Sequence, residues 1–122
     1  MRLPASLFAL LALTGCRELP LGCTNVGCAD GLVVLVRDNP PGPWEIEVAA
    51  GLTTRTFTCS AGLRCTTAFF PGFVPGTVTV TVRANGRSQV LSNLTPTPHV
   101  NRPNGAHCPT ACQQPRITVS LP

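Results

Sequence analysis

The sequence contains no lysine and no tyrosine, and it is poor in charged and aromatic residues. Only 11% of its 122 residues are charged and 5% are aromatic. All nine basic residues are arginines, and with five acidic residues they give a formal net charge of +4. A charge this small, with no basic cluster, argues against nucleic acid as the main partner.

The sequence also lacks the pattern of long helices and of membrane-spanning runs. Thirteen prolines and eleven glycines are distributed along the chain, and proline breaks helices while glycine weakens them. The apolar run from Leu3 to Leu13 is too short to cross a bilayer, which takes about 20 apolar residues. Apolar residues nevertheless make up 43% of the chain. We therefore expect one folded domain, built without long helices.

The N-terminus has the pattern of an export signal. Arg2 supplies a positive charge and an apolar stretch follows it, as in a secretory signal peptide. The stretch ends in Leu13-Thr14-Gly15-Cys16, which resembles the lipobox of bacterial lipoproteins. The resemblance implies that residues 1–15 are a signal peptide, that the chain is cleaved before Cys16, and that Cys16 carries acyl chains such as palmitate.

The cysteine count agrees with this interpretation. Seven cysteines would leave one unpaired, whereas lipidation of Cys16 leaves six for three disulfides. The six are Cys23, Cys28, Cys59, Cys65, Cys108 and Cys112. Their spacings, C-x4-C, C-x5-C and C-x3-C, differ from the C-x2-C of zinc sites. Because thiols of exported proteins oxidise, we expect disulfides and no metal site.

Six cysteines allow fifteen pairings. Cys59 and Cys65 flank a short turn and are placed to pair locally. Cys28 comes just before the first expected strand, and Cys112 just before the last. If those two strands lie side by side, the pairs Cys28–Cys112 and Cys23–Cys108 would join the two ends of the domain. Three local pairs are the main alternative.

Seven segments have strand patterns. In residues 44–51, for example, Trp44, Ile46 and Val48 alternate with Glu45 and Glu47, which places the two sets on opposite faces. The continuous apolar run in 31–38 instead indicates a strand buried on both faces. The segments are 31–38, 44–51, 53–60, 64–70, the two arms of 77–91, and 116–121. Their number and spacing predict an all-β, antiparallel-rich sandwich.

Asn85-Gly86 predicts a hairpin between the two arms of residues 77–91. A three-residue loop, Ala84-Asn85-Gly86, would pair Val80 with Val90 and Val82 with Ser88, so that both Val80 and Val90 face the core. It would also place Gly86 at the bulge position of such a loop. A two-residue turn would pair Thr81 with Val90 instead. We predict the three-residue loop.

Three stretches carry a family resemblance: "GLVVLVRD" with the Pro/Gly turn after it, "PGTVTVTVRANG", and "CPTACQQPRITVSL". Together they resemble small bacterial lipoproteins with a carboxypeptidase regulatory-like (transthyretin-like, or prealbumin-like) domain. The resemblance implies a seven-stranded, disulfide-stapled sandwich over 28–122, with 16–27 as a lipidated tether, and a non-catalytic role. Two departures, Val or Thr at the usual aromatic position and extra cysteines, leave an immunoglobulin-like strand order as the alternative.

The remaining polar residues suggest a surface for binding, without a catalytic pattern. The proline-rich stretch from Ser92 to Pro115 is our candidate interaction loop. Its candidate residues are Pro96, Pro98, His99, Asn101, Arg102 and His107. Glu45 and Glu47 share a strand face, but alternating acids are also typical of a solvent face. Because no nucleophile motif or calcium-loop spacing occurs, we expect neither an enzyme nor a cofactor.

These observations predict a lipid-anchored protein of a bacterial envelope, with an extracytoplasmic domain that binds an unknown protein or envelope component. Position 17 is Arg rather than Asp, so the inner-membrane retention signal of enterobacterial lipoproteins is not seen. The outer membrane is therefore expected if the envelope has two membranes. One alternative is an inhibitor of a lytic enzyme or protease that inserts residues 95–105 into an active site. A second alternative is a small enzyme or metal carrier.

Overall fold

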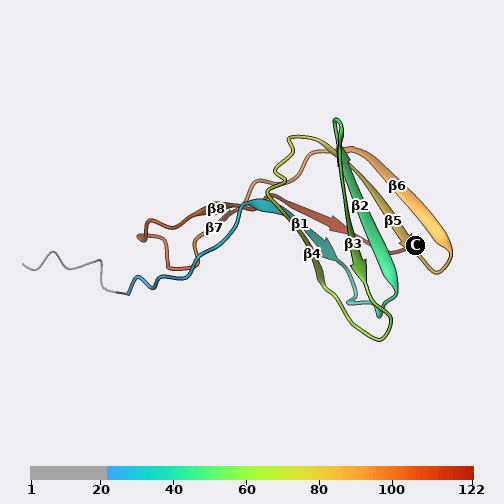
Figure 1. Cartoon of the computed structure of the whole chain (residues 1–122), viewed down its shortest axis with the longest axis horizontal. Coiled ribbons are helices and arrows are strands. Elements are labelled where there is room, and N and C mark those ends of the chain that lie inside the picture. Colours follow the sequence, from blue (N-terminus) through green and yellow to red (C-terminus); the bar gives the residue numbers. More distant parts are fainter. Residues whose placement is uncertain (1–21) are drawn as a thin grey trace, which may run out of the picture.

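The described part of the chain, residues 22–122 of a computed structural model, contains nine strands in three sheets (Figure 1). The predicted signal peptide 1–15, the lipidation site Cys16 and residues 17–21 lie outside the described residues. The first sheet has the order β4-β1-β9, the second β3-β2-β5-β6, and the third is the pair β7-β8. The strands are β1 (Gly31–Val36), β2 (Trp44–Ala50), β3 (Thr53–Cys59), β4 (Thr67–Pro71), β5 (Val78–Ala84), β6 (Arg87–Leu94), β7 (Val100–Asn101), β8 (Cys112–Gln113) and β9 (Arg116–Val119).

The all-β fold expected from the sequence is confirmed, with nine strands rather than seven. The seven predicted segments form β1 to β6 and β9, and the two additional strands, β7 and β8, are two-residue strands within the long proline-rich stretch. β1 pairs antiparallel with β4 and parallel with β9. Residues 22–122 contain no helix that is long and apolar enough to span a bilayer.

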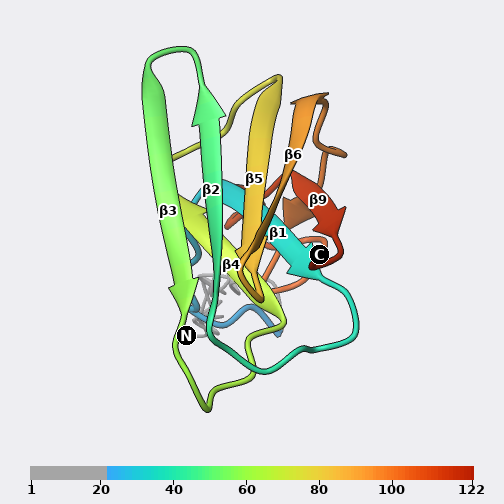
Figure 2. The same ribbon diagram turned by 90° about the vertical axis from the view of Figure 1, so that its right-hand side faces the viewer.

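The core lies between the three-stranded and the four-stranded sheet. Figure 2 looks onto the four-stranded sheet, with β1, β4 and β9 behind it. Alternation along the strands supplies the apolar layer, because side chains two residues apart point to the same face. In β5 every second residue is buried, and in β2 the predicted residues Trp44, Ile46 and Val48 are. The largest fully buried side chains are Leu32, Val34, Ile46, Val48, Cys59, Val78, Val80 and Val82.

β1 is apolar on both faces, although only one face meets the other sheet. Leu32 and Val34 have no exposed surface and belong to the core. On the outer face Val33 is 8% exposed, because Phe69 of β4 and Arg116 of β9 flank it in register. Leu35 on the same face is half-buried. The expected burial on both faces is therefore complete for Val33 and partial for Leu35.

The β5–β6 hairpin differs from our prediction. Ala84 pairs with Arg87 and Thr81 with Val90, which leaves Asn85-Gly86 as a two-residue turn. Both turn residues have positive φ, 56° and 69°, as a type I′ turn requires. Val90 consequently lies on the outer face and is 59% exposed. The predicted three-residue loop, with Val80 opposite Val90 and Val82 opposite Ser88, was wrong.

A bulge in β6 restores its core face. Val80 pairs with Leu91 and Val78 with Leu94, and the register shifts between these pairs. Asn93, with φ of 54°, sits within the shifted segment. One extra residue reverses the alternation, so Leu91 and Leu94 both pack against the core although they are three positions apart. Leu91, Leu94 and the bulge thus supply the core contacts of β6 that Val90 and the three-residue loop were expected to supply.

Candidate functional site

Residues 22–30 lie beside residues 98–114 and project with them from the sandwich (Figure 1). We call these two segments the stalk. Two disulfides join them, Cys23–Cys108 and Cys28–Cys112, with Cα–Cα distances of 5.7 and 6.1 Å. The third disulfide among the described residues, Cys59–Cys65, closes a short loop in the sandwich. These are the pairs favoured above, rather than three local pairs.

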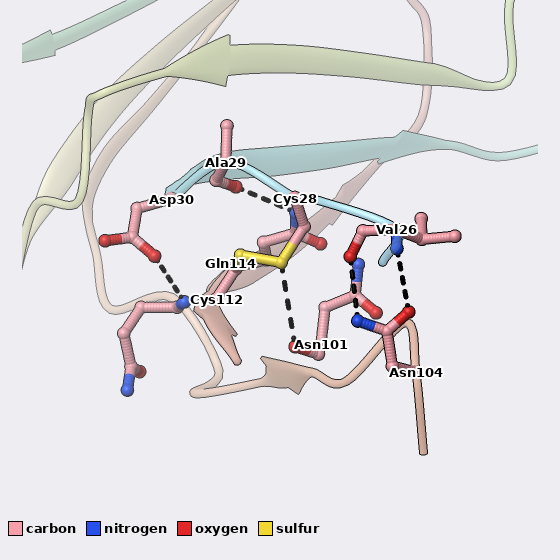
Figure 3. Close-up of a disulfide and its surroundings, with 9 residues drawn as sticks. Val26, Cys28, Ala29, Asp30, Asn101, Asn104, Cys112 and Gln114 are labelled. Carbon is pink, nitrogen blue, oxygen red and sulfur yellow. Dashed lines mark hydrogen bonds between the residues drawn. A yellow bond between two sulfur atoms is a disulfide. The ribbon is translucent and has the colours of Figure 1, made fainter. Parts of the chain in front are cut away.

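Asn104 fastens the outer part of the stalk. Its side chain is buried, and its Oδ1 accepts hydrogen bonds from the backbone N–H of Val26 (3.1 Å) and from the hydroxyl of Thr24. Its Nδ2 donates to the carbonyl of Val26 (2.9 Å; Figure 3). An amide side chain can donate and accept at once. Asn104 therefore takes the place of a neighbouring strand's backbone along residue 26.

Two further side chains fasten the inner part of the stalk, next to the start of β1. The Asp30 carboxylate accepts a hydrogen bond from the backbone N–H of Gln113 (2.7 Å), and Gln114 Nε2 donates to the carbonyl of Ala29 (2.9 Å; Figure 3). The backbone N–H of Gln114 also donates to the carbonyl of His99 (2.8 Å). Both segments of the stalk are thus bound to each other along their length.

The stretch from Ser92 to Pro115, our candidate interaction loop, is mostly the body of this stalk. Its candidate residues do not converge on one point of the surface. His99 contacts Arg116, and Asn101 belongs to β7. Pro96 is buried, whereas Pro98, Arg102 and His107 are exposed. The described part of the predicted tether, residues 22–27, is likewise part of the stalk rather than a separate linker.

The two glutamates on the outer face of β2 are joined by an arginine. Arg83 Nη1 lies 2.8 Å from Glu45 Oε1 and 3.3 Å from Glu47 Oε2. All three side chains are about one-third exposed or more. This is the geometry of a surface ion pair, in which the guanidinium compensates the carboxylates. It does not leave the two acids free to share a proton, as an acid–base pair would require.

Several open hollows lie on the surface of the described residues. One of about 390 Å³ lies over Glu45, Arg83 and the hairpin turn at Asn85. Two others, of about 320 and 440 Å³, lie on either side of Arg116. Within residues 22–122 no group of three or more His, Cys, Asp or Glu side chains is close enough to hold a metal ion.

Among the polar residues that the structure brings into defined positions, sequence reasoning missed Asn104 and Arg116. Asn104 precedes a glycine and has the pattern of an ordinary turn, while Arg116 opens the last strand and has the pattern of a solvated edge residue. No local signal in the sequence marks either of them, because their partners lie 17 to 80 positions away. Comparison with protein-family models, with curated proteins and with solved structures finds no match to this chain.

Proposed function

We propose that the protein is a lipid-anchored component of a bacterial envelope that displays a non-catalytic β-sandwich on a stalk. The observation that carries the proposal is the clamping of residues 22–30 by two disulfides and by Asn104. Acyl chains on Cys16 would leave only residues 17–22 between the anchor and the first clamped cysteine, Cys23. The stalk would then hold the sandwich away from the bilayer, and the short segment between anchor and stalk would limit its movement.

The proposed lipid anchor is supported by the lipobox and by the number of cysteines. All six cysteines other than Cys16 are paired in the structure, so Cys16 has no intramolecular partner left. Each buried methylene adds about 0.8 kcal/mol to membrane binding, and one chain alone binds only marginally. The two or three chains of a bacterial lipoprotein would hold the protein stably, in the outer membrane if the envelope has two.

The stalk changes where a partner is expected to bind. Because residues 98–114 hold the N-terminal segment, we place the docking surface on the sandwich, not on the proline-rich stretch. The resemblance to carboxypeptidase regulatory-like domains supports a docking or stabilising role. The inhibitor alternative loses its main support, since residues 95–105 are held by Asn104 and by the backbone pairing of Thr97 with Arg116.

Intact mass spectrometry of the protein from its native membrane tests the proposal. We expect a mature chain that begins at Cys16, carries two or three acyl chains, and gains six alkyl groups only after reduction. The matched control, Cys16→Ser, should carry no acyl chain. An unlipidated wild-type chain with one free thiol would overturn the anchor and the envelope location together.

A further inference from the structure

We infer that Arg116 and the apolar hollows on either side of it bind a single-chain amphiphile with a carboxylate head, such as a long-chain carboxylic acid. This site is separate from the proposed lipid anchor at Cys16 and does not depend on it. Its elements are the outer face of the three-stranded sheet, the edge of β9 and the neighbouring side of β6.

The first hollow lies over the outer face of the three-stranded sheet. It measures about 320 Å³, and its apolar lining is Val33, Leu35 and Phe69. Thr67, Gln114 and Arg116 complete the rim. The lining follows from the register, which places Phe69, Val33 and Arg116 in one row across β4, β1 and β9. An apolar floor therefore ends directly at a guanidinium group.

The second hollow lies where the edge of β9 meets β6. It measures about 440 Å³ and is lined by Leu91, Leu94 and Ile117 together with the threonines 95, 97 and 118. Leu91 lies opposite Val80 on the core side of β6, and the bulge that follows it turns Leu94 to the same side. Leu35 and Arg116 line both hollows, so the two adjoin at these residues.

Among the described residues that line the two hollows, Arg116 alone is charged. No carboxylate within residues 22–122 lies within 4 Å of it, since the ion pairs of the described chain all belong to Arg83. Its side chain is exposed and contacts His99, with Nη2 2.9 Å from His99 Nε2. A guanidinium only donates, so His99 accepts at Nε2 in this contact. Arg116 thus presents an exposed guanidinium without a carboxylate partner at the border of the two hollows.

A long-chain carboxylate matches both the charge of Arg116 and the apolar lining of the hollows. Its head can accept two parallel hydrogen bonds from the planar guanidinium, and its tail can cover the apolar lining beside it. An uncharged chain would gain no charge-assisted hydrogen bond from the arginine, and a cationic chain would be repelled by it. A polyanion would find a single cation surrounded by Leu, Val and Phe side chains.

Methyl NMR of the full chain tests this site, with sodium decanoate as the probe. The chain carries Cys16→Ser, so that no attached acyl chain competes. We expect decanoate to shift the methyl signals of Leu35, Leu91 and Leu94 in a saturable manner. The cationic amphiphile of the same chain length, decyltrimethylammonium, should not bind there. Shifts spread over the whole domain, or equal binding of the two amphiphiles, would overturn the proposal.

Two variants separate the head contact from the tail contact. Arg116→Gln removes a charge-assisted hydrogen bond and should weaken decanoate binding about tenfold or more. Leu35→Gln, which lies outside the core, should weaken it as well. The matched control is Arg87→Gln, at an exposed arginine that lines neither hollow, and it should bind like the parent chain. Unchanged binding in Arg116→Gln, or binding of decyl phosphate tenfold tighter than decanoate, would contradict the carboxylate site.

Discussion

The sandwich and the stalk are held together by different forces. The buried residues of the sandwich are almost all aliphatic or aromatic and form one continuous core. The stalk has three buried residues, Asn104, Cys108 and Cys112. Its two strands, β7 and β8, contain two residues each, far fewer than an independent hairpin needs. A segment without a core can therefore keep a defined shape when disulfides and polar side chains replace apolar burial.

The disulfides of the stalk also connect the two ends of the described chain. Cys23–Cys108 and Cys28–Cys112 span 85 and 84 positions, so either one alone closes the long loop that contains the sandwich. Once one is closed, the other closes only a small ring of about ten residues. In the chain-entropy account, the first closure stabilises more than the second.

Removal of both stalk disulfides should have the largest effect. We expect the four serine substitutions, at positions 23, 28, 108 and 112, to lower the free energy of unfolding by about 7 kcal/mol, and either pair of substitutions alone by about 3 kcal/mol. Guanidinium denaturation followed by the fluorescence of Trp44, the only tryptophan, would measure this. If the two single-bridge effects simply add up to the double effect, the nested-loop account is wrong.

Truncation of a core side chain should have the next largest effect. Ile46 has no exposed surface, and Ile46→Ala should destabilise the protein by about 2–5 kcal/mol through lost burial and a cavity. The matched change in the stalk is Val26→Ala, at a side chain that is 52% exposed. It should change the free energy of unfolding by about 0.5 kcal/mol or less. Similar losses in both variants would show that the stalk has an apolar core of its own.

Loss of the Asn104 amide should have the smallest and most local effect. Asn104→Ala removes the bonds to both backbone groups of Val26, and we expect the amide of Val26 to exchange with solvent about ten times faster, the equivalent of about 1.4 kcal/mol. Amides of β2 and β5 should keep their exchange rates. His107→Ala, at an exposed stalk residue, is the control. Equal acceleration in β2 and β5 would mean that stalk and sandwich open as one unit.

Local pattern was sufficient to predict the strands of the sandwich. The alternation of Trp44, Ile46 and Val48 with two glutamates requires an extended chain with one buried face, whatever it packs against. The same holds for the alternating valines of β5. The pairing of Cys28 with Cys112 followed from a further condition, that the first and last strands are neighbours, and β1 and β9 are indeed paired.

The apolar pattern led to a wrong prediction at the β5–β6 hairpin, where two different pairings both satisfy it. Val90 fits the core face if the hairpin loop has three residues, whereas Leu91 and Leu94 fit it if the turn has two and the strand contains a bulge. The second solution occurs. It combines a favourable Asn-Gly turn with larger apolar side chains packed against the core. Only the packing of the whole sheet distinguishes the two, because each is locally consistent.

The sequence by itself determined the strands, their buried faces and the six cysteines available for pairing, because these depend on near neighbours and on simple parity. Tertiary structure decided what the proline-rich stretch is. Residues 98–114 have the composition of a free loop, and they become a stalk because Asn104, Asp30 and the cysteines meet partners about 80 positions away. Arg116 gained its setting between two apolar hollows in the same way, from strands that are distant in the chain. Contacts of this kind produce no periodic pattern in the sequence, because they depend on how the two sheets are joined.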